Sequence, residues 1–235
     1  MKIVANNKMI RRNKRIGNFT TIGSLVVLGL GLYVSFTAQT SDGFTWSMVC
    51  LILGFLMSQV GIFFGNRWGR SPRPDELITN ALKGLDDKYI LYHYMTAVSH
   101  LLVGPAGVWI LLPFQQQGSI TYDPAKKRLN QKGGNWYMKL FAQEGIGRPD
   151  QEVTSSIDEL NKFIKKEGEV PGLPEPEAVV VFVHPKSNVN AGNAYFPALH
   201  VEKLKDFIRG HAKREPASLD SVRVFQQLLP SESID

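Results

Sequence analysis

The sequence is poorest in cysteine: Cys50 is the single example in 235 residues. One cysteine excludes an intrachain disulfide framework and a cysteine-based metal site. Its position inside an apolar run, with no cysteine elsewhere, fits a protein that folds in a reducing compartment such as the cytoplasm.

Charged side chains are missing from two long stretches near the N-terminus, Thr20 to Ala38 and Trp46 to Gly65. At a rise of about 1.5 Å per residue, each stretch approaches the roughly 30 Å thickness of a hydrocarbon core. A buried core helix is usually shorter and carries a polar stripe. A cleaved signal peptide would have small residues at its exit, where this chain has Phe36-Thr-Ala38. We therefore predict a transmembrane helical hairpin over residues 18–65.

The distribution of Lys and Arg orients this hairpin. Neither residue occurs in the connection 39–45, whereas six precede the first run and three follow the second within residues 67–73. Because basic residues accumulate on the cytoplasmic side of membranes, we predict an inner (cell) membrane protein with both termini in the cytoplasm. The predicted segments are a basic arm (1–17), the hairpin (18–65) and a linker (66–74). The side chains expected to contact anionic lipid headgroups are Arg11, Arg12, Lys14, Arg15, Arg67 and Arg70.

Small residues four positions apart favour close approach of the two predicted helices. They are Gly31 with Ser35 in the first helix and Gly54 with Ser58 in the second.

The positive charge of the chain belongs to its N-terminal part. Residues 1–70 contain eight Lys and Arg against one acid, a net +7, whereas the whole chain carries +6. The remaining residues therefore carry 19 basic and 20 acidic side chains, a net −1. The near-neutral net charge of the soluble domain does not favour a nucleic-acid-binding face. It does not exclude a local basic patch.

After residue 74 the pattern becomes that of a globular α/β domain. Apolar residues at helical spacing predict helices at 75–86, 149–167, 201–209 and 219–229. Runs of β-branched and aromatic residues predict strands at 88–94, 97–103, 108–114, 119–122, 178–183 and 197–200. The Gly-Pro-Ala-Gly sequence at 104–107 predicts a tight turn that joins two of these strands as a hairpin. Polar loops are expected at 123–134 and 187–193, and residues 211–235 are expected to form a tail outside the domain 75–210.

The order of these elements resembles a NERD (nuclease-related) domain, found in many bacterial membrane and signalling proteins. The residues that carry the resemblance are Glu76 on the first helix, the hairpin 99–111, the Gln-x-Gly-x-Ile step 116–120, the helix start 149–151 and the strand 179–182. The resemblance implies a restriction-endonuclease-like αβββαβ domain behind the two-helix anchor.

Such nucleases hold a divalent metal with an acid on the first helix, an Asp at the start of the hairpin and a Glu-x-Lys on its second strand. Here Glu76 matches the first acid, Ser99 stands at the Asp position, and Leu112-Pro-Phe114 occupies the Glu-x-Lys positions. No Asp or Glu occurs between Asp87 and Asp123. Because Mg²⁺ needs several oxygen ligands, the resemblance implies the fold with a degenerate catalytic motif.

Other chemical motifs are absent or weak. The sequence has no nucleotide-binding glycine motif and no nucleophile elbow, and its five histidines are scattered, so ordinary structural roles are expected for them. The candidates for a polar site, expected near the same side of the sheet, are Glu76, Ser99, His100 and Gln115.

Two functional hypotheses follow. The first is a non-catalytic binding or scaffold module, a pseudo-enzyme without a cofactor, tethered to the cytoplasmic membrane face with another protein as its expected partner. Nucleic acid is a possible partner that the charge does not favour. The alternative is a membrane-bound nuclease or other hydrolase that uses Mg²⁺ in a rearranged site.

Overall fold

The chain folds as two units in the computed structural model, which describes residues 1–133, 145–167 and 172–235. Residues Met1–Asn6 and Pro74–Asp235 form an α/β unit, and Asn7–Arg73 form a helical unit. The chain thus leaves the α/β unit at Asn6 and returns to it at Pro74. This division differs from the predicted one, in which the domain starts at residue 75.

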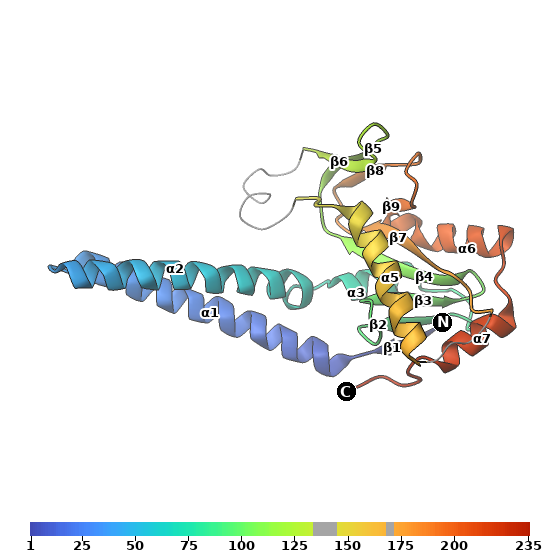
Figure 1. Cartoon of the computed structure of the whole chain (residues 1–235), viewed down its shortest axis with the longest axis horizontal. Coiled ribbons are helices and arrows are strands. Elements are labelled where there is room, and N and C mark those ends of the chain that lie inside the picture. The colour runs from blue at the N-terminus through green and yellow to red at the C-terminus, as the bar shows by residue number, and fades with distance from the viewer. Residues whose placement is uncertain (134–144, 168–171) are drawn as a thin grey trace. The chain divides into compact units, whose positions relative to one another are not determined.

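The helical unit contains two long helices that run side by side, α1 (Asn7–Thr37) and α2 (Ser41–Phe64), followed by the π-helical turn η1 (Gly65–Gly69) (Figure 1). The hydroxyl of Thr40 caps α2 by accepting the N–H of Gly43. Both helices are long and apolar enough to cross a membrane. Their large apolar side chains point outward, with 72% of Phe19, 66% of Leu25 and 66% of Trp46 exposed. An apolar surface of this extent needs a cover other than water.

The contact between α1 and α2 consists of small residues. Ser47 donates its hydroxyl to the carbonyl of Gly31 at 2.8 Å. A Cβ atom at Gly61 would stand 2.5 Å from Oγ1 of Thr21, so only glycine fits there. The contact residues recur at intervals of seven: Gly17, Ser24 and Gly31 in α1, and Ser47, Gly54 and Gly61 in α2.

This seven-residue repeat corrects the predicted four-residue spacing. Gly31 and Gly54 lie in the contact, but Ser35 is exposed and the hydroxyl of Ser58 donates to Phe55 of its own helix. A repeat of seven keeps one seam facing the partner helix along its length, as in left-handed helix pairs.

The α/β unit is built on a six-stranded sheet in the order β1-β2-β3-β4-β7-β9. Its strands are β1 (Lys2–Ala5), β2 (Ile90–His93), β3 (His100–Gly104), β4 (Gly107–Phe114), β7 (Pro176–Phe182) and β9 (Ala198–His200). The predicted hairpin of 97–103 and 108–114 is present as β3 and β4, with Gly107 at φ +96° in the turn between them.

Strand β1 precedes the helical unit in sequence but belongs to this sheet. It pairs in parallel with β2, placing Val4 opposite Tyr92. The α-ammonium of Met1 donates to Asp87 at 2.7 Å, and this hydrogen bond and charge hold the pKa of the Asp87 carboxyl below its usual value. The predicted basic arm 1–17 is therefore an edge strand followed by the first turns of α1.

Helices cover both faces of the sheet. On one face α5 (Pro149–Glu167) and α7 (Leu219–Gln227) contribute Leu160 and Phe225, both fully buried. On the other face α3 (Pro74–Ala81) and α6 (Leu204–Arg214), the latter preceded by the 3₁₀ turn η2 (Val201–Lys203), contribute Ile78 and Ile208. Figure 1 shows α5 crossing the strands. The unit is thus a three-layer α/β/α fold, a mixed α/β class as predicted.

Three segments differ from the predicted elements. The expected loops 123–134 and 187–193 contain β6 (Arg128–Lys132) and β8 (Ser187–Asn190), which flank β5 (Gly118–Asp123) in a second, three-stranded sheet. The sequence analysis did not recognise these two strands because their side chains are mostly polar, and a half-exposed strand need not be apolar. The helix predicted at 219–229 is present as α7, but the segment 211–235 is not a tail outside the domain, because Phe225 of α7 is fully buried.

The N-terminal strand generates a test with a matched control inside β1. Val4 is 1% exposed in the core, whereas its neighbour Ile3 is 43% exposed. We expect Val4→Ala to lower the unfolding free energy of the α/β unit by about 2 kcal/mol. Ile3→Ala should change it by less than about 0.5 kcal/mol. Urea unfolding of the detergent-solubilised full chain, followed by tryptophan fluorescence, measures both. Equal effects would contradict the placement of β1.

Candidate functional site

Two buried histidines join the ends of β2 and β3. His93 ends β2, His100 begins β3, and the two are direct partners in the antiparallel register. Their Nδ1 atoms lie 2.8 Å apart, and Nε2 of His93 lies 2.9 Å from the hydroxyl of Thr79 on α3. The two histidines are 2% and 1% exposed. The pair is therefore an internal polar cluster between the sheet and α3.

The chemistry of this pair follows from its geometry. A hydrogen bond between two Nδ1 atoms requires one ring to donate a proton and the other to accept it. The two rings therefore cannot both be imidazolium while this bond exists. The His93–His100 pair can store or relay one proton, and its burial keeps bulky substrates from the rings.

Tyr94 closes this cluster on the β2 side. Its φ of +57° lies in the left-handed region, which costs a non-glycine residue of order 1–3 kcal/mol. Its N–H donates to the carbonyl of Ser99 at 2.7 Å, and its ring meets the edge of His100 at a centroid distance of 5.0 Å. These contacts hold the connection between His93 and His100 in one conformation.

The hydrogen bonds and ring contacts described above do not join the four predicted site residues, Glu76, Ser99, His100 and Gln115, into one cluster. His100 is the member that contacts a second histidine. Ser99 precedes β3 and provides a backbone carbonyl to Tyr94, Glu76 lies in the first turn of α3, and Gln115 follows β4. The member of this histidine pair that the sequence analysis did not single out is His93. The predicted turn 104–107 fixes only the register of β3 against β4. The pairing of His93 with His100 belongs to β2 and β3, for which the sequence analysis had no turn signal.

Leu112 and Phe114, where the resemblance implies a Glu and a Lys, pack against the hydrophobic core. Phe114 is 6% exposed and contacts the ring of Phe182 at a centroid distance of 5.7 Å, and Leu112 packs partly buried against the same cluster. Within residues 1–133, 145–167 and 172–235, no group of three or more His, Cys, Asp or Glu is placed to hold a metal ion.

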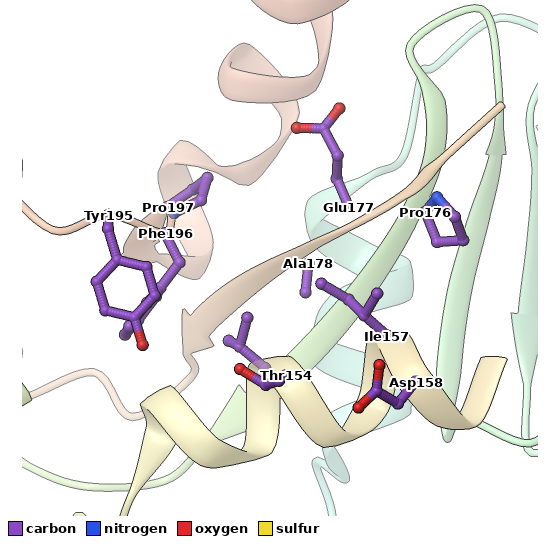
Figure 2. A pocket seen from close by; sticks show the side chains of 10 residues that line it. Thr154, Ile157, Asp158, Pro176, Glu177, Ala178, Tyr195, Phe196 and Pro197 are labelled. Atoms are coloured by element: carbon purple, nitrogen blue, oxygen red, sulfur yellow. The ribbon is translucent and has the colours of Figure 1, made fainter. Parts of the chain in front are cut away.

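A second feature is a groove of about 310 Å³ at the β9 side of β7 (Figure 2). Helix α5 forms one wall and the segment before β9 forms the other. Its lining residues are Val153, Thr154, Ile157, Asp158, Pro176, Glu177, Ala178, Tyr195, Phe196 and Pro197.

Charged groups surround this groove. Arg148 donates to Asp150 at 3.0 Å at the start of α5, and this hydrogen bond lowers the pKa of the Asp150 carboxyl. Burial raises the pKa of the Glu177 carboxyl, even though His211 Nε2 lies 3.6 Å from its Oε1. Burial also raises the pKa of Tyr195, to which the charge of Asp150 adds.

Comparison of the chain with protein-family models, curated proteins and solved structures finds no match. Function is therefore inferred from the two features above and from the anchor.

The histidine pair generates a double-mutant test. His93→Ala and His100→Ala each remove the Nδ1 partner of the other ring, so each should lower the unfolding free energy by about 1–3 kcal/mol. Because the two rings share one interaction, the double variant should lose at least about 1 kcal/mol less than the two losses combined.

Urea unfolding of the full chain in detergent measures this coupling. The control cycle combines His93→Ala with His200→Ala, since β3, β4 and β7 separate β2 from β9 in the sheet. That control should be additive within about 0.5 kcal/mol. Additivity in the His93–His100 cycle itself would contradict the hydrogen bond.

Proposed function

We propose that this protein is a membrane-tethered, non-catalytic binding or scaffold module with a NERD-like domain on the cytoplasmic face of the inner membrane. The observation that carries the proposal is the apolar packing of Leu112 and Phe114. A nuclease of this type needs a carboxylate and an ammonium group at these two positions. Introducing either charge here would disrupt the core, because a buried unpaired charge is strongly destabilising.

The order of elements supports the restriction-endonuclease-like part of the proposal. Helix α3 precedes the antiparallel strands β2, β3 and β4, and α5 then leads to β7, which pairs in parallel with β4. This is the αβββαβ order of such a core, with β5 and β6 inserted before α5.

The insertion of the helical unit supports a hairpin topology. Strand β1 precedes α1, and its partner β2 follows α2. One folded sheet cannot lie on both sides of a bilayer, so a chain that leaves the sheet and returns to it must cross the membrane an even number of times. In this proposal α1 and α2 cross once each.

The basic residues support a cytoplasmic location of the sheet. All six side chains proposed to contact anionic headgroups are exposed and lie before or within the first turns of α1, or after the end of α2. The opposite end of the hairpin, residues 38–45, contains Asp42 and no Lys or Arg. Each basic group near an anionic membrane surface contributes on the order of 1 kcal/mol to attachment. The groups are Arg11, Arg12, Lys14, Arg15, Arg67 and Arg70.

Nuclease activity is tested with the full chain in lipid nanodiscs, because a fragment that starts at residue 71 would lack β1. The substrates are single- and double-stranded DNA and RNA with Mg²⁺ or Mn²⁺. We expect no metal-dependent cleavage and no difference between the native chain and Glu76→Ala. Cleavage that Glu76→Ala abolishes would overturn the proposal in favour of a metal-dependent nuclease with a rearranged site.

The topology is tested with two fusions in a bacterial host. A reporter that is active only in the cytoplasm should be active when fused after Asp235. A phosphatase that folds only outside the cytoplasm should be active when inserted after Gln39, in the hairpin connection. A well-expressed but inactive cytoplasmic fusion after Asp235 would exclude the proposed orientation.

A further inference from the structure

Among the described residues, no strand pairs with the outer edge of the first part of β7. Its outer neighbour β9 pairs with Val180–Phe182 in the part of the chain that the structure describes, whereas β7 begins at Pro176. The N–H of Val180 donates to the carbonyl of Pro197 at 2.9 Å. Since the backbone groups of alternate residues in a strand point to the same edge, those of Ala178 also face this side, beyond the end of β9.

The groove lies directly beside this edge. Figure 2 shows Thr154 and Ile157 of α5 along one wall and Tyr195 and Phe196 along the other. Ala178 lies at its base, and its small side chain leaves the space open. A volume of about 310 Å³ with mainly apolar walls fits an aliphatic side chain together with its backbone.

The two charged side chains that line the groove, Asp158 and Glu177, are both acidic. Asp158 belongs to the α5 wall and is exposed. Glu177 points to the opposite face of the sheet (Figure 2), toward His211, and Glu215 is 3.8 Å from the same imidazole nitrogen. The basic group at this end of α5, Arg148, is already paired with Asp150. A positively charged ligand is therefore complementary to both faces of this edge.

We propose that the groove binds an extended segment of a partner protein in which apolar and basic side chains alternate. The segment adds to the free edge of β7 and hydrogen-bonds the backbone of Ala178. An apolar side chain enters the groove, and the next side chain, Lys or Arg, lies on the opposite face beside Glu177. Main-chain bonds of this kind supply affinity, and the alternating pockets supply specificity. This inference rests on the proposed binding function and specifies the partner.

The test uses the full chain in zwitterionic phosphatidylcholine nanodiscs, which present no net charge to the probe. The probe is a fluorescein-labelled peptide of sequence Val-Lys-Val-Lys-Val, and fluorescence polarisation at low salt measures its binding, with empty nanodiscs subtracted. We expect saturable binding to the native chain. Val-Glu-Val-Glu-Val should bind at least about tenfold more weakly, because Glu177 and Asp158 repel it.

Two pairs of variants locate the binding. Thr154→Trp fills the groove from an exposed helix position and should weaken binding at least about tenfold, whereas Ser155→Trp, exposed on the same helix outside the groove, should not. Glu177→Gln should weaken binding about two- to fivefold, as expected for an exposed ion pair. Glu159→Gln, an exposed carboxylate outside the lining, should leave it unchanged. Thermal melts confirm that all four variants are folded.

Several outcomes would overturn the inference. They are the absence of saturable binding to the native chain, equal binding by Thr154→Trp, or equal affinity for the acidic peptide. Nanodisc particles that self-associate through the groove, with a particle mass that Thr154→Trp reduces and without peptide binding, would assign the groove to a second copy of the chain. Any of these results, with the nuclease assay still negative, would leave the proposed function standing. Metal-dependent cleavage would instead overturn the proposed function itself.

Discussion

The parallel pairing of β1 with β2 constrains the rest of the molecule. Residues Lys2–Ala5 form hydrogen bonds with a strand that lies more than eighty positions away, and the two long apolar helices are inserted between them. The helical unit is therefore an insertion between two strands of one folded sheet. In the proposed topology this insertion requires an even number of membrane crossings. Two chain segments therefore connect the α/β unit to the helical unit.

Successive side chains along each strand point to opposite faces of the sheet, so they belong to different hydrophobic cores. Leu101 and Val103 belong to the core under α5, whereas Leu102 belongs to the core under α3 and α6. The histidine pair lies toward α3, at the ends of β2 and β3. Leu112 and Phe114 pack against the core under α5. The histidine pair and these two positions therefore lie on opposite faces of the sheet.

The two edges of the sheet differ in what covers them. At the β1 edge the C-terminal segment already hydrogen-bonds the strand, because the N–H of Ala5 donates to the hydroxyl of Ser233 and its carbonyl accepts the N–H of Ile234. At the other side, β9 is shorter than β7, and the groove beside Ala178 results from that mismatch. Pro176, which has no N–H to offer, stands at the start of β7, where a proline is tolerated in a strand. The free edge is therefore limited to a few backbone groups, enough for a short segment and too little for open-ended strand pairing.

Much of the architecture follows from the sequence alone, because periodicity reports which face of an element is buried. The two uncharged runs correspond to α1 and α2, the apolar spacing in 149–167 corresponds to α5, and the hairpin around residues 104–107 corresponds to β3 and β4. The local pattern of apolar residues does not show which strands pair when they are far apart in the sequence. Lys2–Ala5 is too short and too close to a basic segment to be recognised as a strand, and β6 and β8 are polar. Only tertiary structure brings His93 to His100 and starts β9 opposite Val180, past Ala178, because both depend on strand register and on the packing of α3 and α5 against the sheet.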